Sequence, residues 1–227
     1  MELRQNTNNP RVLIADDHAI FAESLRNSLE KWYRVVGVIL DGRAMVLEAL
    51  RLRPDVVVAD IGMPILNGLD AARRIREQCP NMRFIFLTMR DDPNLAAAAL
   101  ELGKIAFVLK HSGVTELLEA IEQVMRGRCY LTPKLRPGDL ATAKARARQF
   151  SKELTLRQRE FLQLFAEGGS MKQIASVLNL SEKTVEFHKH HLMEVFNLKS
   201  NAALVLFALK QGLVTADSES GPGSHTA

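Results

Sequence analysis

The sequence predicts an α/β domain with a doubly wound, five-stranded parallel sheet, followed by a small all-α domain of four helices. Two observations lead to this prediction. In the first half of the chain, short apolar runs rich in β-branched residues alternate with stretches of helical spacing, which is typical of parallel sheets covered on both faces. After residue 152 the strand pattern does not return, and only helical spacing is found.

The first domain, expected over residues 10–127, consists of five strand–helix units. Its strands are predicted at Val12–Ala15, Val35–Leu40, Val56–Ala59, Phe84–Leu87 and Ile105–Leu109. Its helices are predicted at Ala19–Lys31, Ala44–Leu52, Gly68–Gln78, Asn94–Leu102 and Val114–Met125. Right-handed crossovers bring the carboxyl ends of all the strands to one edge, so a ligand site is expected there.

The second domain, expected over residues 153–214, follows a linker at 128–152 in which the periodicity fades. Its helices are predicted at about 156–167, 171–178, 182–196 and 201–211. Capping-box spacing or an N-cap serine marks where they begin, at Thr155 with Gln158, Ser170 with Gln173, Ser181 and Ser200. Residues 215–227 have no apolar pattern and are expected to form a disordered tail.

The composition limits the classes of protein to consider. No apolar run approaches the roughly 18 residues that cross a bilayer, and the chain begins with a polar stretch, so we expect a cytoplasmic protein that does not contact membranes. Cys79 and Cys129 have no metal-binding spacing and are interpreted as reduced packing thiols. Residues 134–227 carry 13 basic and 9 acidic residues, whereas residues 1–133 carry 17 of each. The second part is therefore the candidate for binding nucleic acid.

Polar or charged side chains end several of the predicted strands. Asp16 and Asp17 follow the first strand, Asp60 the third, Thr88 the fourth and Lys110 the fifth. Three carboxylates at one edge repel each other unless a cation neutralises them, and Mg2+ prefers such oxygen ligands. A hydroxyl and an ammonium complete a site suited to phosphoryl transfer. Taken singly, the aspartates could cap a helix, and the other two could be ordinary surface groups.

Residues 11–126 resemble a receiver domain of the flavodoxin-like kind. The resemblance lies in LIADDH, DIGMPILNG, FLTM and AFVLK. It implies that Asp60 is the phosphoacceptor and that Mg2+ is held by Asp17 directly, by Asp16 mainly through water, by Asp60 and by the backbone carbonyl of Gly62.

The same resemblance assigns roles to three further residues. Thr88 and Lys110 would hold the phosphoryl oxygens, and Phe107 occupies the place of an aromatic side chain that turns inward when Thr88 engages the phosphoryl group. A core aromatic on the fifth strand is an equally good interpretation of Phe107, and the two do not exclude each other.

The second and third helices of the second domain form a helix-turn-helix. Apolar residues give both an inner edge, and Asn179-Leu180 forms the turn between them. The outer face of the later helix carries Lys183, Glu186, Phe187, Lys189 and His190. Such a helix enters the major groove of DNA, although each residue could also belong to a solvated helix face.

Residues 154–214 resemble the LuxR-type helix-turn-helix of the NarL/FixJ regulators, through LTLRQREFLQLFAEG and SMKQIASVLNLSEKTVEFHKHHLMEVFNLKS. The resemblance implies base-facing positions and a dimer interface on the last helix. Base contacts are expected from Glu186, Phe187 and His190, and phosphate contacts from Lys183, Thr184, Lys189 and Lys199. A metal site at the histidines 188, 190 and 191 is disfavoured because no cysteine or acidic cluster lies nearby.

Together the two halves predict a two-component response regulator rather than an enzyme. A sensor histidine kinase would phosphorylate Asp60, and the modification would favour a homodimer on promoter DNA. By family analogy the unphosphorylated receiver obstructs the recognition helix. Two alternatives stay open: a constitutive DNA-binding protein with a silent receiver, and an aspartyl-phosphate phosphotransferase, which is disfavoured because Gly62 stands where such enzymes have a second aspartate.

Overall fold

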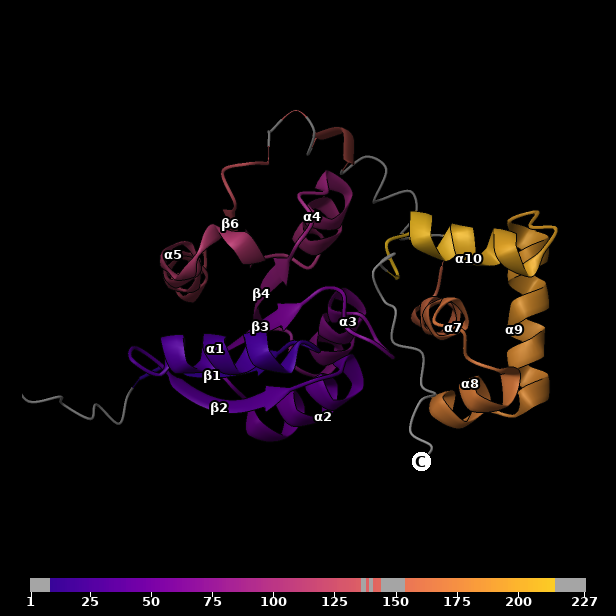
Figure 1. Ribbon diagram of the computed structural model, residues 1–227, viewed down its shortest axis with the longest axis horizontal. Helices are drawn as coiled ribbons and strands as arrows, with labels where there is room; N and C mark the ends of the chain where they lie inside the picture. The colour runs from indigo at the N-terminus through magenta and orange to yellow at the C-terminus, as the bar shows by residue number, and fades with distance from the viewer. Residues whose placement is uncertain (1–8, 136–137, 139–140, 144–153, 215–227) are drawn as a thin grey trace, which may run out of the picture.

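A computed structural model describes residues 9–135, 138, 141–143 and 154–214. It confirms the predicted fold class, because a parallel sheet with helices on both faces is followed by an all-helical domain (Figure 1). The predicted tail at 215–227 and most of the second half of the predicted linker lie outside the described residues. The predicted domain boundaries therefore stay predictions.

The sheet has the strand order β2-β1-β3-β4-β5-β6 and is parallel throughout. The strands are β1 (Arg11–Ala15), β2 (Arg34–Ile39), β3 (Val56–Asp60), β4 (Arg83–Thr88), β5 (Ile105–Leu109) and β6 (Tyr130–Leu131). Every residue of the strands β3 and β5 is buried, which explains why both are almost continuously apolar in sequence. Alternate residues of each strand point to opposite faces of the sheet, so the domain has two cores.

The helices of this domain begin and end close to the predicted residues. They are α1 (Ala19–Leu29), α2 (Gly42–Leu52), α3 (Gly68–Gln78), α4 (Pro93–Leu100) and α5 (Val114–Met125). Helices α1 and α5 pack on one face of the sheet, and α2, α3 and α4 cover the other. Side-chain oxygens of Asp41, Asn67 and Asp92 accept hydrogen bonds at the starts of α2, α3 and α4.

The predicted count of five strands was one too low. Strand β6 lies inside the segment expected to be linker, where Ala106 pairs with Tyr130 and Phe107 with Leu131. The amide of Thr132 also donates to the carbonyl oxygen of Phe107 at 2.9 Å. A strand of two residues is too short to show a periodic pattern, so the sequence could not reveal it.

The second domain contains α7 (Leu156–Ala166), α8 (Met171–Leu178), α9 (Glu182–Val195) and α10 (Asn201–Lys210). Both predicted capping boxes are present, and both predicted N-cap serines accept a backbone hydrogen bond. Asn179 has the left-handed conformation (φ 55°) that ends α8. The four helices enclose one core, in which α7, α8 and α9 are joined by buried side chains such as Phe161, Ile174 and Leu192.

Two of the expectations from composition can be compared with the structure. Within the described residues, no helix is both long enough and apolar enough to cross a membrane. Both cysteines are free, but only Cys79 is buried, whereas Cys129 is exposed. The interpretation as packing thiols therefore holds for Cys79 and is wrong for Cys129.

Candidate functional site

The predicted site at the carboxyl ends of the strands is brought together by the sheet. The register pairs Ala15 of β1 with Ala59 of β3, so the residues that follow, Asp16 and Asp60, lie side by side. Lys110, which directly follows β5, reaches between them. Its Nζ lies 2.7 Å from Asp16 Oδ2 and 2.9 Å from Asp60 Oδ2.

The electrostatics of the site leave Asp60 poorly compensated. Its side chain is buried, and burial together with the neighbouring charge of Asp16 raises its pKa, although Lys110 and the backbone N–H of Gly62 oppose the rise. Burial alone would lower the pKa of Lys110, but the two carboxylates outweigh burial and raise it. The ammonium therefore stays charged and is shared between two anions.

The same edge is suited to a hard divalent cation. The ligand atoms of Asp16, Asp17, His18 and Asp60 lie within 4.8 Å of one another, and among the described residues no other group of three or more such side chains is found. Asp16 Oδ2 and Asp17 Oδ1 are buried, and their near neighbours are the ammonium of Lys110 and the ring of His18. Carboxylate oxygens gathered around one point fit Mg2+.

The aspartates do not cap the first helix. The residue at the N-cap of α1 is His18, and no side-chain cap bond is present. The backbone amide of His18 donates instead to Asp16 Oδ1 at 3.0 Å, and the ring Nδ1 of His18 lies 2.9 Å from Asp17 Oδ1. His18 was not predicted as a site residue, although it directly follows Asp16 and Asp17 in the sequence.

Two glycines allow the chain to approach the site closely. A Cβ on Gly68, at the start of α3, would lie 2.1 Å from the carbonyl oxygen of Asp60. A Cβ on Gly42, at the start of α2, would lie 1.7 Å from the carbonyl oxygen of Leu66. Both positions therefore require glycine. Gly68 belongs to the motif DIGMPILNG, which was the signal that could have identified it.

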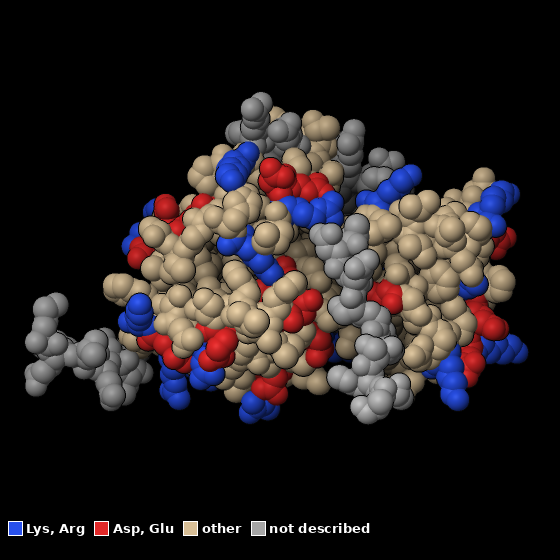
Figure 2. Space-filling view, viewed as in Figure 1, with Lys and Arg blue, Asp and Glu red and all other residues tan. Residues whose placement is uncertain are grey.

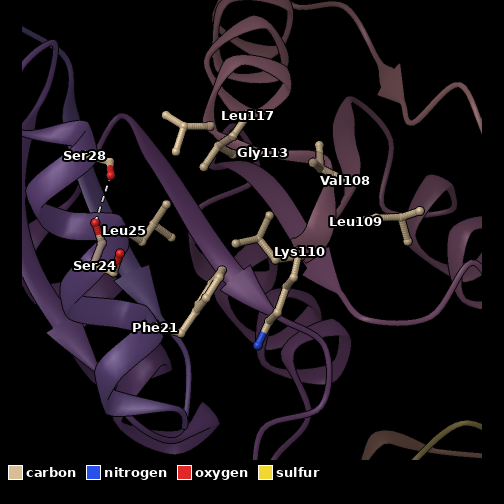
Figure 3. Close-up of a pocket in the computed structure, with 11 residues that line it drawn as sticks. Phe21, Ser24, Leu25, Ser28, Val108, Leu109, Lys110, Gly113 and Leu117 are labelled. Atoms are coloured by element: carbon tan, nitrogen blue, oxygen red, sulfur yellow. Dashed lines mark hydrogen bonds between the residues drawn. The ribbon is translucent and has the colours of Figure 1, made fainter.

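The two other predicted side chains of the first domain, Thr88 and Phe107, are both buried. Thr88 is buried at the end of β4, and its hydroxyl accepts a hydrogen bond from the amide of Arg90 at 3.1 Å. Phe107 is fully buried in the core, as the core interpretation expected. Phe21 of α1, which was not predicted, has its ring centroid 4.9 Å from Lys110 Nζ, and Figure 3 shows the two side chains next to each other among the residues that line a pocket. The ring limits the positions open to the ammonium.

The outer face of α9 is open to solvent. Phe187 is 65% exposed, and Lys183, Glu186 and His190 are exposed as well. In Figure 2 basic side chains stand among acidic ones along the edge of the domain where Figure 1 shows α9. The ring of Phe187 stacks on that of His191, with centroids 6.0 Å apart, and its exposed side is available to a ligand.

Of the other three residues predicted to contact DNA, Thr184 and Lys189 contact neighbouring side chains, whereas Lys199 does not share this restriction. Lys189 is half-buried, with its Nζ 5.4 Å from the ring centroid of Phe165. The hydroxyl of Thr184 lies 2.8 Å from that of Ser181 at the start of the helix. Lys199 is exposed beyond the end of α9. Among the described residues, the histidines 188, 190 and 191 form no group of potential metal ligands.

The two domains contact each other through α7, which lies beside α3, whereas α9 lies on the far side of its domain (Figure 1). Arg159 of α7, for example, donates to both carboxylate oxygens of Asp70 at 2.8 and 3.0 Å. In this arrangement the receiver contacts α7, and residues on the outer face of α9 stay exposed, so the expected obstruction of the recognition helix stays a prediction.

A buried acidic site with a shared lysine, joined to a helix-turn-helix, defines the class of two-domain response regulators. Comparison with known proteins supports the same class. Residues 12–122 match the response regulator receiver domain, and residues 152–208 match the bacterial regulatory proteins of the luxR family.

Relatives and solved structures span nearly the whole chain. The oxygen regulatory protein NreC of Staphylococcus carnosus is 33% identical over 90% of this chain and 99% of its own length. The transcriptional regulatory protein DegU of Brevibacillus brevis is 28% identical over 94% of this chain and 99% of its own length. RcsB of Salmonella enterica serovar Typhimurium, bound to the promoter rprA with the phosphomimetic BeF3-, is 30% identical, with a TM-score of 0.58 over 89% of this chain and 99% of that one.

The chain belongs to the NarL/FixJ family of response regulators, with a receiver domain and a LuxR-type DNA-binding domain. Members of this family regulate transcription and are not enzymes.

Proposed function

We propose that a sensor histidine kinase or a small phosphodonor transfers a phosphoryl group to Asp60, and that the modification controls dimerisation and promoter binding. The observation that carries this proposal is the buried Asp60 carboxylate, which shares one lysine with Asp16. A carboxylate oxygen of Asp60 would form a bond to phosphorus while the bond from phosphorus to the leaving group of the donor breaks.

The surrounding residues supply the charge and the hydrogen bonds that the transfer needs. Lys110 is placed to offset negative charge on the phosphoryl oxygens, and the Thr88 hydroxyl lies at the neighbouring strand end. Asp16, Asp17, Asp60 and the Gly62 carbonyl would hold Mg2+. The ion would offset the charge of the carboxylates and of the transferred group.

The second domain would read promoter DNA through α9. Glu186, Phe187 and His190 would face the bases, and Lys183, Thr184, Lys189 and Lys199 would contact phosphates. The exposure of the outer face of α9 supports this assignment, as does the promoter complex of the similar RcsB. We place this activity in the cytoplasm, where bacterial promoter DNA is found. The exposed part of α10 would be available for contact with a second copy of the chain.

The phosphorylation step is tested by the mass of the intact protein. Incubation with acetyl phosphate and Mg2+ is expected to add one phosphoryl group to the wild-type chain and none to Asp60→Asn. Chelation of Mg2+ should prevent the gain, because the carboxylates would then repel the donor. No gain in mass for the wild type, while a control regulator is modified, would contradict the proposal.

A constitutive DNA-binding protein is the second candidate, and the open face of α9 favours it. Gel shifts with a promoter library separate the two. Under phosphorylation control, the wild type binds more tightly after treatment with acetyl phosphate, and Asp60→Asn does not respond. Equal affinity with and without the donor would favour constitutive binding.

A further inference from the structure

The loop that follows the phosphoacceptor is held by a side chain of the other domain. This loop, residues 61–67, connects Asp60 to α3. The side-chain amide of Gln163, in α7, donates to the carbonyl oxygen of Met63 at 3.0 Å, and its oxygen accepts from the backbone amide of Asn67 at 2.7 Å. Gln163 is only 1% exposed, so these hydrogen bonds do not compete with water.

The side chain of Glu167, the C-cap residue of α7, holds the middle of the loop. The amide of Ile65 lies 3.2 Å from both carboxylate oxygens of Glu167, and Glu167 Oε1 also accepts from Gln163 Nε2 at 2.8 Å. Ile65 has a φ of 69°. A β-branched residue in this conformation costs about 1–3 kcal/mol and persists only when its surroundings hold it. Glu167 and Gln163 are therefore part of what maintains the shape of the loop.

The same loop also contacts the phosphoacceptor, through Gly62. The N–H of Gly62 bonds to the Asp60 carboxylate, and the Gly62 carbonyl is the proposed backbone ligand of the cation. One peptide bond joins Gly62 to Met63, whose carbonyl oxygen accepts from Gln163. The orientation of the Gly62 carbonyl and the position of α7 are thus linked through a single residue.

Charged groups fix α7 against α3 beside these hydrogen bonds. Asp70 lies between Arg159 of α7 and Arg73 of its own helix, and Glu160 of α7 forms an ion pair with Arg74. Asp70 and Glu160 are buried. Because buried pairs tolerate little displacement, this cluster sets where Gln163 lies relative to the loop.

We propose that Gln163 and Glu167 are positioning residues of the phosphorylation site, so that the docked DNA-binding domain keeps the Gly62 carbonyl oriented for Mg2+. The inference rests on the proposed function, because it assumes that Mg2+ binds at Asp60. Residues outside the ligand set that orient the ligands commonly change metal affinity by about 10–100-fold.

The test is Mg2+ affinity measured by isothermal titration calorimetry on the full chain. Gln163→Met, which keeps the size of the side chain and removes its hydrogen bonds, is expected to weaken binding about tenfold. Glu167→Ala is expected to weaken it too, whereas Glu167→Gln, which keeps an acceptor for the Ile65 amide, should bind nearly as the wild type does. Gln173→Met is the matched control, because Gln173 forms the capping box of α8.

The outcomes separate this inference from the proposed function. Equal or tighter Mg2+ binding by Gln163→Met and Glu167→Ala overturns the inference, while the proposed function stands if acetyl phosphate still modifies the wild type. A wild type that binds no Mg2+ and gains no phosphoryl group overturns both. Circular dichroism confirms that each variant is folded, and if Gln163→Met is not, the two Glu167 variants decide.

Discussion

Asp60, at the end of β3, and Asp70, in the first turn of α3, are both buried. The charges around the two carboxylates differ. Burial and the nearby Asp16 raise the pKa of Asp60, which shares its lysine. Asp70 is more deeply buried, but Arg159, Arg73 and Asn67 outweigh the burial and lower its pKa. The difference shows that compensation, rather than burial, separates a carboxylate available for chemistry from one that joins two domains.

The largest effect on stability is expected from Asp70→Asn. The substitution leaves Arg73 and Arg159 without their shared anion, so it should lower the free energy of unfolding by about 3 kcal/mol. Urea denaturation followed by circular dichroism measures the change. Glu77→Gln, on the exposed side of the same helix, is the control and should change stability by less than about 0.5 kcal/mol. A similar loss in the control would remove the contrast between the two aspartates.

Magnesium should stabilise the chain through the site at Asp60. At a concentration about 100 times its Kd, a ligand specific for the folded state adds about 2.7 kcal/mol, which would raise Tm by several degrees. The shift is expected to disappear with EDTA and in Asp17→Asn, and to remain in Glu77→Gln. Calorimetry measures it, and an equal shift in Asp17→Asn would show that the ion binds elsewhere.

Asp60→Asn is expected to change stability in the opposite direction from Asp70→Asn. Without Mg2+, removing a poorly compensated carboxylate should raise the free energy of unfolding by about 1 kcal/mol, since Lys110 still pairs with Asp16. The same urea titration, carried out in EDTA, measures it. A loss comparable to that of Asp70→Asn would mean that Asp60 is also a structural anchor.

The smallest effect concerns Glu167. Burial raises its pKa above the ordinary value of 4.5, so below pH 4.5 it is protonated in both states and costs nothing. As the pH rises through the folded-state pKa, the buried charge lowers stability. Glu167→Gln should thus raise the free energy of unfolding by less than about 1 kcal/mol at pH 7.5, with the gain shrinking toward pH 5. Urea titrations at several pH values test this, and a gain that does not depend on pH would contradict it.

The sequence was sufficient to predict the helices and most strands, and to bring the residues of the acidic site together. Helical and strand spacing placed the predicted elements within a few residues, because the pattern reports which faces are buried. Asp16, Asp60 and Lys110 could be brought together in advance because parallel strands end at one edge. The same reasoning could not find strand β6, which is too short to show a pattern.

The contacts between the domains could not be predicted. In sequence Gln163 is one polar residue on a helix, and Asp70 is an acidic residue in the first turn of another. Each forms hydrogen bonds with the other domain, and no local pattern reports a contact made across about 90 residues. Which helix of the second domain contacts the receiver could not be predicted for the same reason.

With α7 docked and the outer side of α9 uncovered, one copy of the chain can meet a half-site without its domains separating. Paired half-sites on B-DNA one helical turn apart have centres about 34–36 Å from each other. In this arrangement, the geometry between two copies, rather than shielding within one copy, is what the proposed phosphorylation of Asp60 would adjust.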